Sequence, residues 1–311
     1  MRKLLIWVLL LAGIVSDRGI CCAELLPLNK IASQNGLKML SANSFAGANG
    51  LVFSFTEKSR TFVCNKILMP LGFPAVKRYF KVCIDSSDYK CHISPLLFPA
   101  RQHWKKVKVI ALDAGHGGED DGTISPSHNL KEKILTMDVC VRVAKFLEHN
   151  GYRVVFVRQG DKKIPLERRP QIANSEGADL FVCIHFNSAP NQNANGIETF
   201  ILTPSNQAST YQKSSKTSGR DLIGNDFNEL NVILGYCLQS SLIEKLGATD
   251  RGVKHERFTV LKTLKCPGAL IECGFLSNAP ESAKITSAAY RNKLAEGIAR
   301  GIERFDNLVG K

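Results

Sequence analysis

The chain has 311 residues, of which 41 are basic and 28 acidic, so its formal net charge is +13 and its length leaves room for two domains and a sizeable core. This charge predicts an anionic partner, or else a solvated surface that keeps the protein soluble. No basic stripe with interleaved aromatic residues is present, which argues against a nucleic-acid-binding protein.

Residues 1–23 have the features of a secretory signal peptide. A short basic start precedes an apolar run from Leu4 to about Val15, and a small-residue cleavage site ends at Ala23. The run is shorter than the roughly 20 residues of a membrane span, which favours cleavage over an uncleaved anchor. Cys21 and Cys22 suggest lipidation, but Ile20 stands where a small residue is wanted.

Cleavage removes three basic residues and one acidic residue and leaves a net charge of +11. We therefore expect a periplasmic protein without an integral membrane segment after cleavage. Its anionic partner is then a cell-envelope polymer or an anionic membrane surface, and nucleic acid is not expected.

Eight cysteines remain after residue 23. Cys140, Cys183 and Cys273 lie inside apolar runs and are expected to be free core thiols. If a disulfide forms, we expect it within the set Cys64, Cys83 and Cys91. No CxxC pair is present, so the commonest cysteine-based zinc motif is missing.

The pattern of the chain divides it into two unequal parts. Residues 24–96 contain a helix-like segment at 28–37 and short apolar runs at 51–55 and 61–65, which predict a small α+β module. Residues 97–106 carry a proline and several charges and are the expected linker. Residues 107–311 are then the second, larger domain.

From Val107 onward, strand patterns alternate with helix patterns. Strands are expected at 107–113, 152–158, 178–186, 196–202 and 268–275, and helices at 132–151, 166–177, 229–247 and 288–305. The strand at 196–202 alternates like a half-buried one. Such alternation predicts an α/β fold, a mostly parallel twisted sheet flanked by helices on both faces.

Functional groups gather at the carboxyl ends of the strands in such sheets. His116, His185 and Glu272 fall at or just after the end of an expected strand, and Glu132 begins an expected helix. A hydrolytic zinc ion takes three ligands from His and carboxylate, and a further Glu can move the proton of the attacking water. A lone histidine at a strand end is more often structural, but the four residues together predict a metal-dependent hydrolase.

Several sequence motifs follow one another in residues 107–305. They are VIALDAGHGGEDDG, the Glu-Lys pair at 132 and 133, VRQGDKKIPLERRPQIAN, ADLFVCIHFNSA and RGVKHERFTVLKTLKCPGALIECGFLSN. In these motifs the sequence resembles the zinc-dependent N-acetylmuramoyl-L-alanine amidases of the family called amidase type 3, which cleave peptidoglycan during cell separation. The resemblance covers close to two thirds of the chain.

The resemblance implies that His116, Glu132 and His185 bind Zn²⁺ and that Glu272 is the catalytic residue. The reaction implied is hydrolysis of the amide between the lactyl group of muramic acid and L-alanine, with Glu272 taking a proton from the attacking water. Peptidoglycan or its precursors are then the partner, and an activator protein is a further candidate.

The sequence departs from the family pattern at a few positions, none of which removes an implied ligand. They are Ala114 in place of proline, Cys183 in place of serine, and Lys265-Cys266 in place of a more apolar pair. Asp113 or Asn187 could orient a ligand, or bond backbone at a turn. Residues 24–96 resemble a small domain, similar to the N-terminal domain of copper amine oxidases, that precedes some of these amidases; this implies a structural or glycan-binding role without copper.

Residues 203–228 are polar, rich in Ser and Thr, and too long for an ordinary connection. They are either a lid or regulatory segment or a flexible surface loop. Some family members block their zinc with an inserted helix; this insert looks shorter and has no clear amphipathic helix, which favours an enzyme that is not strictly autoinhibited.

Two other functions fit parts of the sequence. One is a catalytically silent peptidoglycan-binding protein, against which the intact set of four residues argues. The other is an additional penicillin-sensitive serine carboxypeptidase activity, suggested by SDYK at 87–90, which fits S-x-x-K, and KTSG at 216–219. Both motifs are short and occur often by chance.

Overall fold

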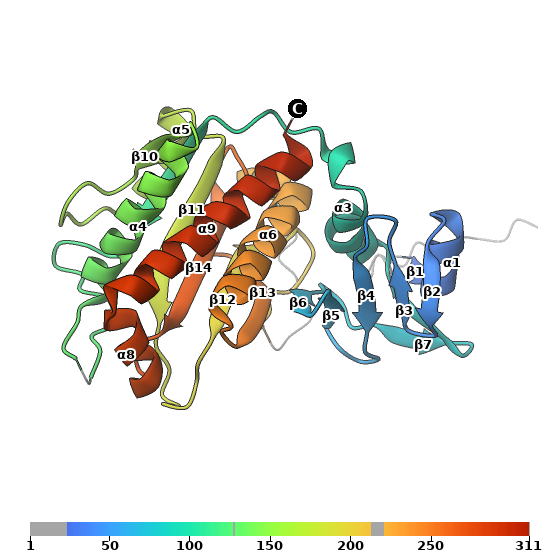
Figure 1. Ribbon diagram of the computed structural model, residues 1–311. Helices are drawn as coiled ribbons and strands as arrows, with labels where there is room; N and C mark the ends of the chain where they lie inside the picture. Colours follow the sequence, from blue (N-terminus) through green and yellow to red (C-terminus); the bar gives the residue numbers. More distant parts are fainter. Residues whose placement is uncertain (1–23, 127, 213–220, 311) are drawn as a thin grey trace, which may run out of the picture.

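The computed structural model describes residues 24–126, 128–212 and 221–310, and a six-stranded sheet forms its larger part (Figure 1). The strand order is β10-β9-β11-β14-β12-β13. The strands are β9 (Val109–Ala114), β10 (Arg153–Phe156), β11 (Leu180–Asn187), β12 (Ile197–Leu202), β13 (Asp250–Glu256) and β14 (Gly268–Phe275). Neighbours are parallel except β12 and β14. The predicted mostly parallel sheet is confirmed; the expected signal peptide and the KTSG motif lie outside the described residues.

Helices cover both faces of this sheet, as predicted. One face packs against α4 (Glu132–His149), α6 (Asn228–Leu246) and α9 (Ala288–Val309), which lie side by side in Figure 1, and the other packs against α5 (Arg168–Ser175) and α7 (Thr259–Lys262). Side chains of a strand alternate between faces, so Ile110 and Leu112 of β9 join the first core and Ala111 the second. The 3-10 helix η3 (Ile223–Phe227) precedes α6, and α8 (Ala279–Thr286) follows β14. None of the described helices has the length and apolar character needed to cross a membrane.

The structure differs from the sequence prediction at the β12 and β13 edge. β12 is buried along its whole length, because it lies between β14 and β13 with both faces covered, so the half-buried expectation was wrong. β13 was not predicted, because its sequence DRGVKHE is polar. Its polar side chains are satisfied by distant partners: Gln239 donates to Asp250, and Lys254 donates to Glu198.

The N-terminal part consists of two antiparallel sheets, of order β1-β8-β7 and β2-β3-β4-β5-β6. The strands are β1 (Leu25–Pro27), β2 (Lys38–Ser41), β3 (Ser44–Ala46), β4 (Val52–Phe55), β5 (Thr61–Cys64), β6 (Ile67–Pro70), β7 (Val76–Arg78) and β8 (Lys81–Asp85). Its helices are α1 (Leu28–Gln34), α2 (Ser86–Asp88), the π-helix η1 (Tyr89–Ile93) and α3 (Ser94–Leu97). Four stacked or tilted phenylalanines, Phe45, Phe53, Phe55 and Phe62, fill the core. The 3-10 helix η2 (Pro99–Gln102) falls in the expected linker, and the division at 97–106 stays a prediction.

All eight cysteines of the described chain are free. Cys140, Cys183 and Cys273 are buried core thiols, as expected. The disulfide considered within Cys64, Cys83 and Cys91 is not present. Cys64 is instead packed in the core of the five-stranded sheet, where burial raises the pKa of its thiol to about 12.

A buried polar cluster joins the N-terminal part to the edge of the large sheet. Asp88 accepts backbone bonds from Gly72 and Phe73, and its Oδ1 lies 3.2 Å from Nδ1 of His92. Nε2 of His92 lies 3.0 Å from Nε2 of His255 on β13, and both rings are fully buried. Burial, and then the positive groups of His92, Arg60 and Arg257, lower the pKa of His255 well below its usual value. His255 is therefore neutral in the folded protein at neutral pH.

This neutral histidine predicts acid-sensitive stability. The unfolded chain protonates His255 near pH 6.5, whereas the folded chain does not, so its contribution is complete above that pH and is lost as the pH falls further. His255→Gln is expected to reduce the slope of the unfolding free energy against pH between 6.5 and 5 by up to about 1.4 kcal/mol per pH unit. Urea unfolding at several pH values measures this. The exposed His149→Gln should leave the slope unchanged; equal slopes for wild type and His255→Gln would contradict the account.

Candidate active site

Three adjacent parallel strands bring the predicted residues to one edge of the sheet. His116 lies two residues after the end of β9, and His185 lies near the end of β11. Glu272 lies on β14 in register with His185. Glu132 is the first residue of α4, which packs against β9 and β11. The carboxyl ends of parallel strands meet at one edge, and the structure brings all four residues together there.

Glu132 is the centre of this cluster and is 2% exposed. Its Oε1 lies 2.9 Å from Nδ1 of His185 and 3.1 Å from Nε2 of His116. The backbone of Phe186 also donates to Oε1 and that of Thr123 to Oε2. Burial would raise the pKa of Glu132, but the bonds and positive charge of the two histidines outweigh it and lower the pKa to about 2. The carboxylate is therefore ionised at any physiological pH.

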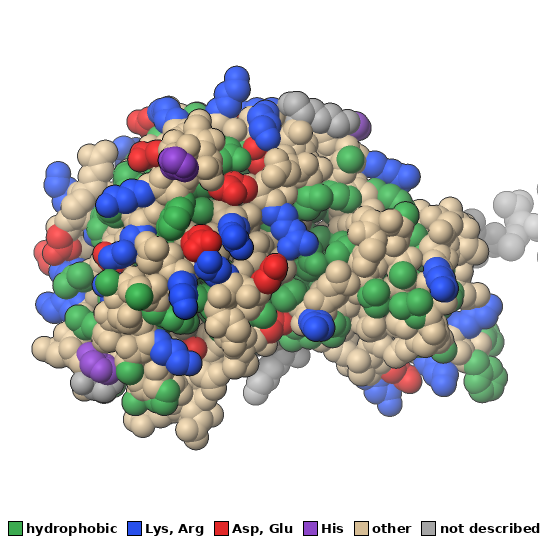
Figure 2. Space-filling model, viewed as in Figure 1, with side chains coloured by type: hydrophobic (Ala, Val, Ile, Leu, Met, Phe, Trp, Pro, Cys, Tyr) green, Lys and Arg blue, Asp and Glu red, His purple; other side chains and the backbone are tan. Residues whose placement is uncertain are grey.

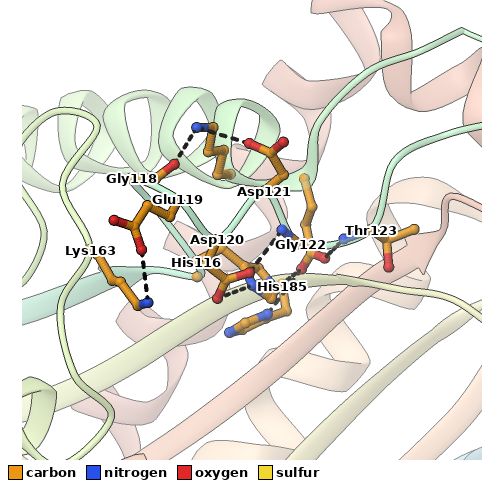
Figure 3. A network of polar contacts seen from close by, with 12 residues as sticks. His116, Gly118, Glu119, Asp120, Asp121, Gly122, Thr123, Lys163 and His185 are labelled. Atoms are coloured by element: carbon orange, nitrogen blue, oxygen red, sulfur yellow. Dashed lines mark hydrogen bonds and ion pairs between the residues drawn. The ribbon is translucent and has the colours of Figure 1, made fainter.

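The rings of His116 and His185 lie next to each other (Figure 3) and meet edge to face, with centroids 4.8 Å apart. The other ring nitrogen of His116, Nδ1, lies 2.9 Å from Oδ2 of Asp120, and Oδ1 of Asp120 accepts from the backbone of Gly122. Burial alone would lower the pKa of His116, but Glu132 and Asp120 outweigh it and raise the pKa. The site thus attracts positive charge, whether a proton or a metal ion.

Buried arginines hold the loop that carries His116. His116 has φ 62°, and Gly117 and Gly118 also have positive φ, a conformation that costs a non-glycine residue energy. Arg158 donates to the carbonyls of Ala114 and Gly115, and Arg169 to the carbonyl of His116. These bonds offset the strain and fix the direction of the imidazole.

Asp113 and Asn187, predicted either to orient a ligand or to bond backbone at a turn, differ in their partners. Asp113 is fully buried and accepts a bond from Arg169, at 2.7 Å, and from the thiol of Cys183. Asn187 accepts a bond from the backbone of Ser188, at 2.7 Å, as the second alternative predicted, and its amide nitrogen donates to Glu198. Asp113 thus holds Arg169, which in turn donates to the carbonyl of His116.

A glycine leaves the room that the second histidine needs. A Cβ placed on Gly115 would lie 2.3 to 2.7 Å from atoms of the His185 ring, which is closer than any side chain tolerates. A Cβ on Gly122 would meet Glu132 and His116 in the same way. The glycine-rich loop therefore serves both to turn the chain and to make space for the rings.

The donor set fits a zinc ion. Ligand atoms of His116, Glu132 and His185 all lie within 4.8 Å of one another, and two imidazoles with one carboxylate are a known ligand set for catalytic zinc. No cysteine contributes, in agreement with the buried, free state of the thiols. The geometry supports a metal site, and the residues present suit Zn²⁺.

Glu272 points into a cavity of about 540 Å³ beside this cluster. Its Oε2 atom is buried and has no hydrogen-bond partner in the described chain. Burial, and then the negative charges of Glu132 and Glu198, raise the pKa of Glu272 well above its usual range. The cavity is lined by His116, His185, Lys163, Arg257, Phe258 and Leu270, among others, so polar groups and apolar surface face the same space.

Sequence reasoning missed a buried charged cluster next to Glu272. Glu198 of β12 lies in register with Glu272 and accepts bonds from Asn187, Arg251 and Lys254. Glu198 is 2% exposed, and a single acidic residue in an apolar strand was the available signal. Its partners Arg251 and Lys254 lie on the strand that was not predicted.

The described ends of residues 203–228 are anchored. Arg60 donates to the carbonyls of Ala208 and Ser209, and Arg257 donates to those of Pro204 and Gln207. Tyr211 reaches the Glu198 cluster through a bond from Lys254. Whether this segment acts as a lid stays a prediction.

Ser87 of the S-x-x-K motif lies outside this cavity. Its hydroxyl donates to Asp85 at 2.6 Å and accepts from Gln207, and Lys90 is exposed. The serine carboxypeptidase hypothesis therefore has no serine–lysine contact among the described residues to support it.

Comparison with known proteins finds one family. The family model described as N-acetylmuramoyl-L-alanine amidase matches residues 110–304. The N-acetylmuramoyl-L-alanine amidase LytC of Bacillus subtilis is 34% identical over 194 residues, 62% of this chain and 34% of LytC. The amidase AmiA of Escherichia coli is 30% identical over 217 residues, 63% of this chain and 75% of AmiA. The chain thus spans about a third of the length of LytC and three quarters of that of AmiA.

Solved structures share this fold. The catalytic domain of CwlV, an N-acetylmuramoyl-L-alanine amidase from Paenibacillus polymyxa, aligns with a TM-score of 0.53 at 28% identity, over 65% of this chain and 99% of that domain. The amidase AmiC2 of Nostoc punctiforme aligns with a TM-score of 0.54 at 28% identity, over 64% of this chain and 96% of that one.

The close approach of Gly115 to His185 predicts a loss of metal affinity on adding one methyl group. Gly115→Ala is expected to push the His185 ring aside and to weaken zinc binding by about 10- to 100-fold, the usual effect of misplacing a ligand. Competition with a chromophoric chelator measures the dissociation constant. Gly177→Ala is the control, because its Cβ meets nothing within 4 Å. Its φ of 66° makes alanine strained there, so its stability should fall, but it should bind zinc as the wild type does. Unchanged affinity in Gly115→Ala would show that His185 is not a ligand.

Proposed function

Because the chain belongs to the N-acetylmuramoyl-L-alanine amidases, enzymes that act on peptidoglycan, we propose that His116, Glu132 and His185 hold a zinc ion and that Glu272 is the catalytic residue. The observation that carries this proposal is a cavity lined by His116, His185 and Glu272. Glu132 bonds to both imidazoles, and Oε2 of Glu272 has no hydrogen-bond partner in the described chain. A bound zinc ion would supply Lewis-acid activation of the attacking water and of the scissile carbonyl.

The side chains of this chain supply the proton transfers. The bond that breaks joins the lactyl carbonyl of muramic acid to the nitrogen of L-alanine, and water adds across it. Glu272 takes one proton from the water as the new C–O bond forms and delivers it to the leaving nitrogen as the C–N bond breaks. Its Oε2 is free for this task, because no group in the described structure bonds to it.

The surroundings keep Glu272 in place and keep its carboxyl facing the cavity. Glu272 lies in the middle of β14, between β11 and β12, so its backbone is fixed by bonds on both sides. The neighbouring carboxylate, Glu198, is instead bonded to Arg251, Lys254 and Asn187. The two carboxylates therefore have separate roles, one catalytic and one structural.

The family and the N-terminal sequence support proposals on export, location and physiological role. We propose that residues 1–23 are a cleaved signal peptide, that the protein works in the periplasm, and that it remodels peptidoglycan during cell separation. We also propose the division into residues 24–96, a linker at 97–106 and a catalytic domain at 107–311. An activator protein stays a candidate partner.

Glu272→Gln is expected to abolish hydrolysis without removing the metal. Loss of a general acid–base group reduces rates by about 10²- to 10⁴-fold, whereas the three ligands remain. Mass spectrometry of products from purified peptidoglycan should show free stem peptides that begin with L-alanine for the zinc-loaded wild type and not for Glu272→Gln.

Two controls separate this hypothesis from the others. Glu148→Gln, an exposed change on α4, should release stem peptides as the wild type does, and so should Ser87→Ala. A wild-type protein that holds zinc and binds peptidoglycan but releases nothing would favour the catalytically silent binder. Full activity in Glu272→Gln would remove that residue from the mechanism.

A further inference from the structure

The tip of the β7–β8 hairpin has an unusual sequence for its turn. Arg78 pairs with Lys81, so the two-residue loop between the strands is Tyr79-Phe80, with φ 46° and 66°. Two positive φ angles are the requirement of a type I′ turn, which normally uses Asn-Gly. Bulky aromatic residues are strained in this conformation. The turn therefore holds two aromatic side chains where local stability favours small ones.

These aromatic side chains point away from the protein. Tyr79 is 93% and Phe80 91% exposed, and the next most exposed large hydrophobic residue of the described chain, Tyr211, is 59% exposed. Neither ring stacks on another ring or packs against the described hydrophobic core. Adjacent exposed aromatic residues of this kind are typical of a surface that docks on an apolar or interfacial partner.

Basic side chains surround the tip. Lys77, Arg78 and Lys81 are exposed, and none has a carboxylate within 4.0 Å among the residues whose positions are given. Figure 2 shows basic and hydrophobic surface meeting over this hairpin, at the lower right of the molecule.

The charge of the whole N-terminal part has the same sign. Residues 24–96 carry nine basic and four acidic residues. The basic residues are Lys30, Lys38, Lys58, Arg60, Lys66, Lys77, Arg78, Lys81 and Lys90, and the acidic ones Glu24, Glu57, Asp85 and Asp88. Since Asp85 and Asp88 are buried, little negative charge remains on this surface.

We propose that the β7–β8 tip, residues 77–81, docks on the surface of an anionic phospholipid bilayer. Aromatic rings favour the headgroup region of a membrane, and lysine and arginine side chains beside them bind anionic headgroups. The convex shape of a hairpin tip suits insertion into a soft surface. A site for one sugar instead needs fixed hydrogen-bonding groups around the ring, and the groups here are long, flexible cationic chains.

Docking through this tip leaves the candidate active site open. β7 lies at the opposite end of the molecule from α4, whose first residue is Glu132 (Figure 1). The hairpin would thus hold the enzyme at a membrane surface by the end of the molecule that lies away from α4. This inference does not depend on the proposed hydrolysis, since it rests on the N-terminal part alone.

Co-sedimentation with vesicles tests the proposal. The chain from residue 24 onward is used, because the apolar run at residues 4–15 would itself bind lipid. It is expected to bind vesicles of phosphatidylcholine with 30% phosphatidylglycerol and not vesicles of phosphatidylcholine alone. Lys77→Gln/Arg78→Gln/Lys81→Gln should weaken binding about 100-fold, since each basic side chain contributes roughly fivefold at an anionic surface.

A second variant removes the rings and keeps the fold. Tyr79→Asn/Phe80→Gly introduces the residues that a type I′ turn prefers, so its melting temperature should not fall, while its vesicle binding should fall at least about tenfold. In Phe80→Trp, the fluorescence emission should shift to the blue when phosphatidylglycerol vesicles are added and should be quenched by brominated lipid.

Matched controls decide whether the effect is local. Lys108→Gln/Lys145→Gln/Lys293→Gln removes three exposed cations from the larger part of the protein, and it should bind vesicles within about threefold of the wild type. Equal losses in the two triple variants would overturn the proposal, because net charge alone would then explain binding. It is also overturned if Tyr79→Asn/Phe80→Gly binds vesicles normally, or if it loses binding to peptidoglycan sacculi instead.

Discussion

A buried carboxylate at the start of α4 determines the geometry of the candidate site. Glu132 accepts bonds from the His185 ring, from the backbone of Phe186 and from the backbone of Thr123, so it ties together β11, α4 and the loop after β9. Burying an anion costs several kcal/mol unless its charge is paired. The site therefore requires a positive partner next to Glu132, and both histidines are placed where a proton or a metal ion provides it.

The strained loop around His116 depends on a second set of buried charges. Arg158 and Arg169 are 2% and 3% exposed, and both donate to carbonyls of the His116 loop. Their other bonds go to Asp113, Lys133, Thr136, Gly160 and Ile164. Planar guanidinium groups with several donors suit this task, because one side chain can hold two or three carbonyls at once. The position of His116 is thus set by residues that lie outside the proposed ligand set.

Much of this arrangement could be predicted from local sequence, because the pattern of apolar residues marks the buried strands. Apolar runs identified β9, β11 and β14, and the strand-end rule then placed His116, His185 and Glu272 at one edge of the sheet. The helix expected at 132–151 begins at Glu132 as predicted and ends at His149, two residues before Gly151, whose φ is 87°.

The remaining features depend on contacts between residues far apart in the sequence. β13 is a strand of polar residues whose partners, such as Glu198 and His92, come from other elements, so no local pattern identifies it. Glu198 lies on the strand at 196–202, which was expected to be half-buried. It is instead buried among Arg251, Lys254 and Asn187. The strain at Tyr79 and Phe80 is likewise visible only once the register of β7 and β8 is known.

The central claim is that His116, Glu132 and His185 bind zinc while Glu272 does not, and X-ray absorption at the zinc edge tests it most directly. The account predicts a first shell with two imidazole nitrogens and additional oxygens in the zinc-loaded wild type, the same shell in Glu272→Gln, and one imidazole in His185→Ala. A shell that keeps two imidazoles in His185→Ala, or that changes in Glu272→Gln, would contradict it.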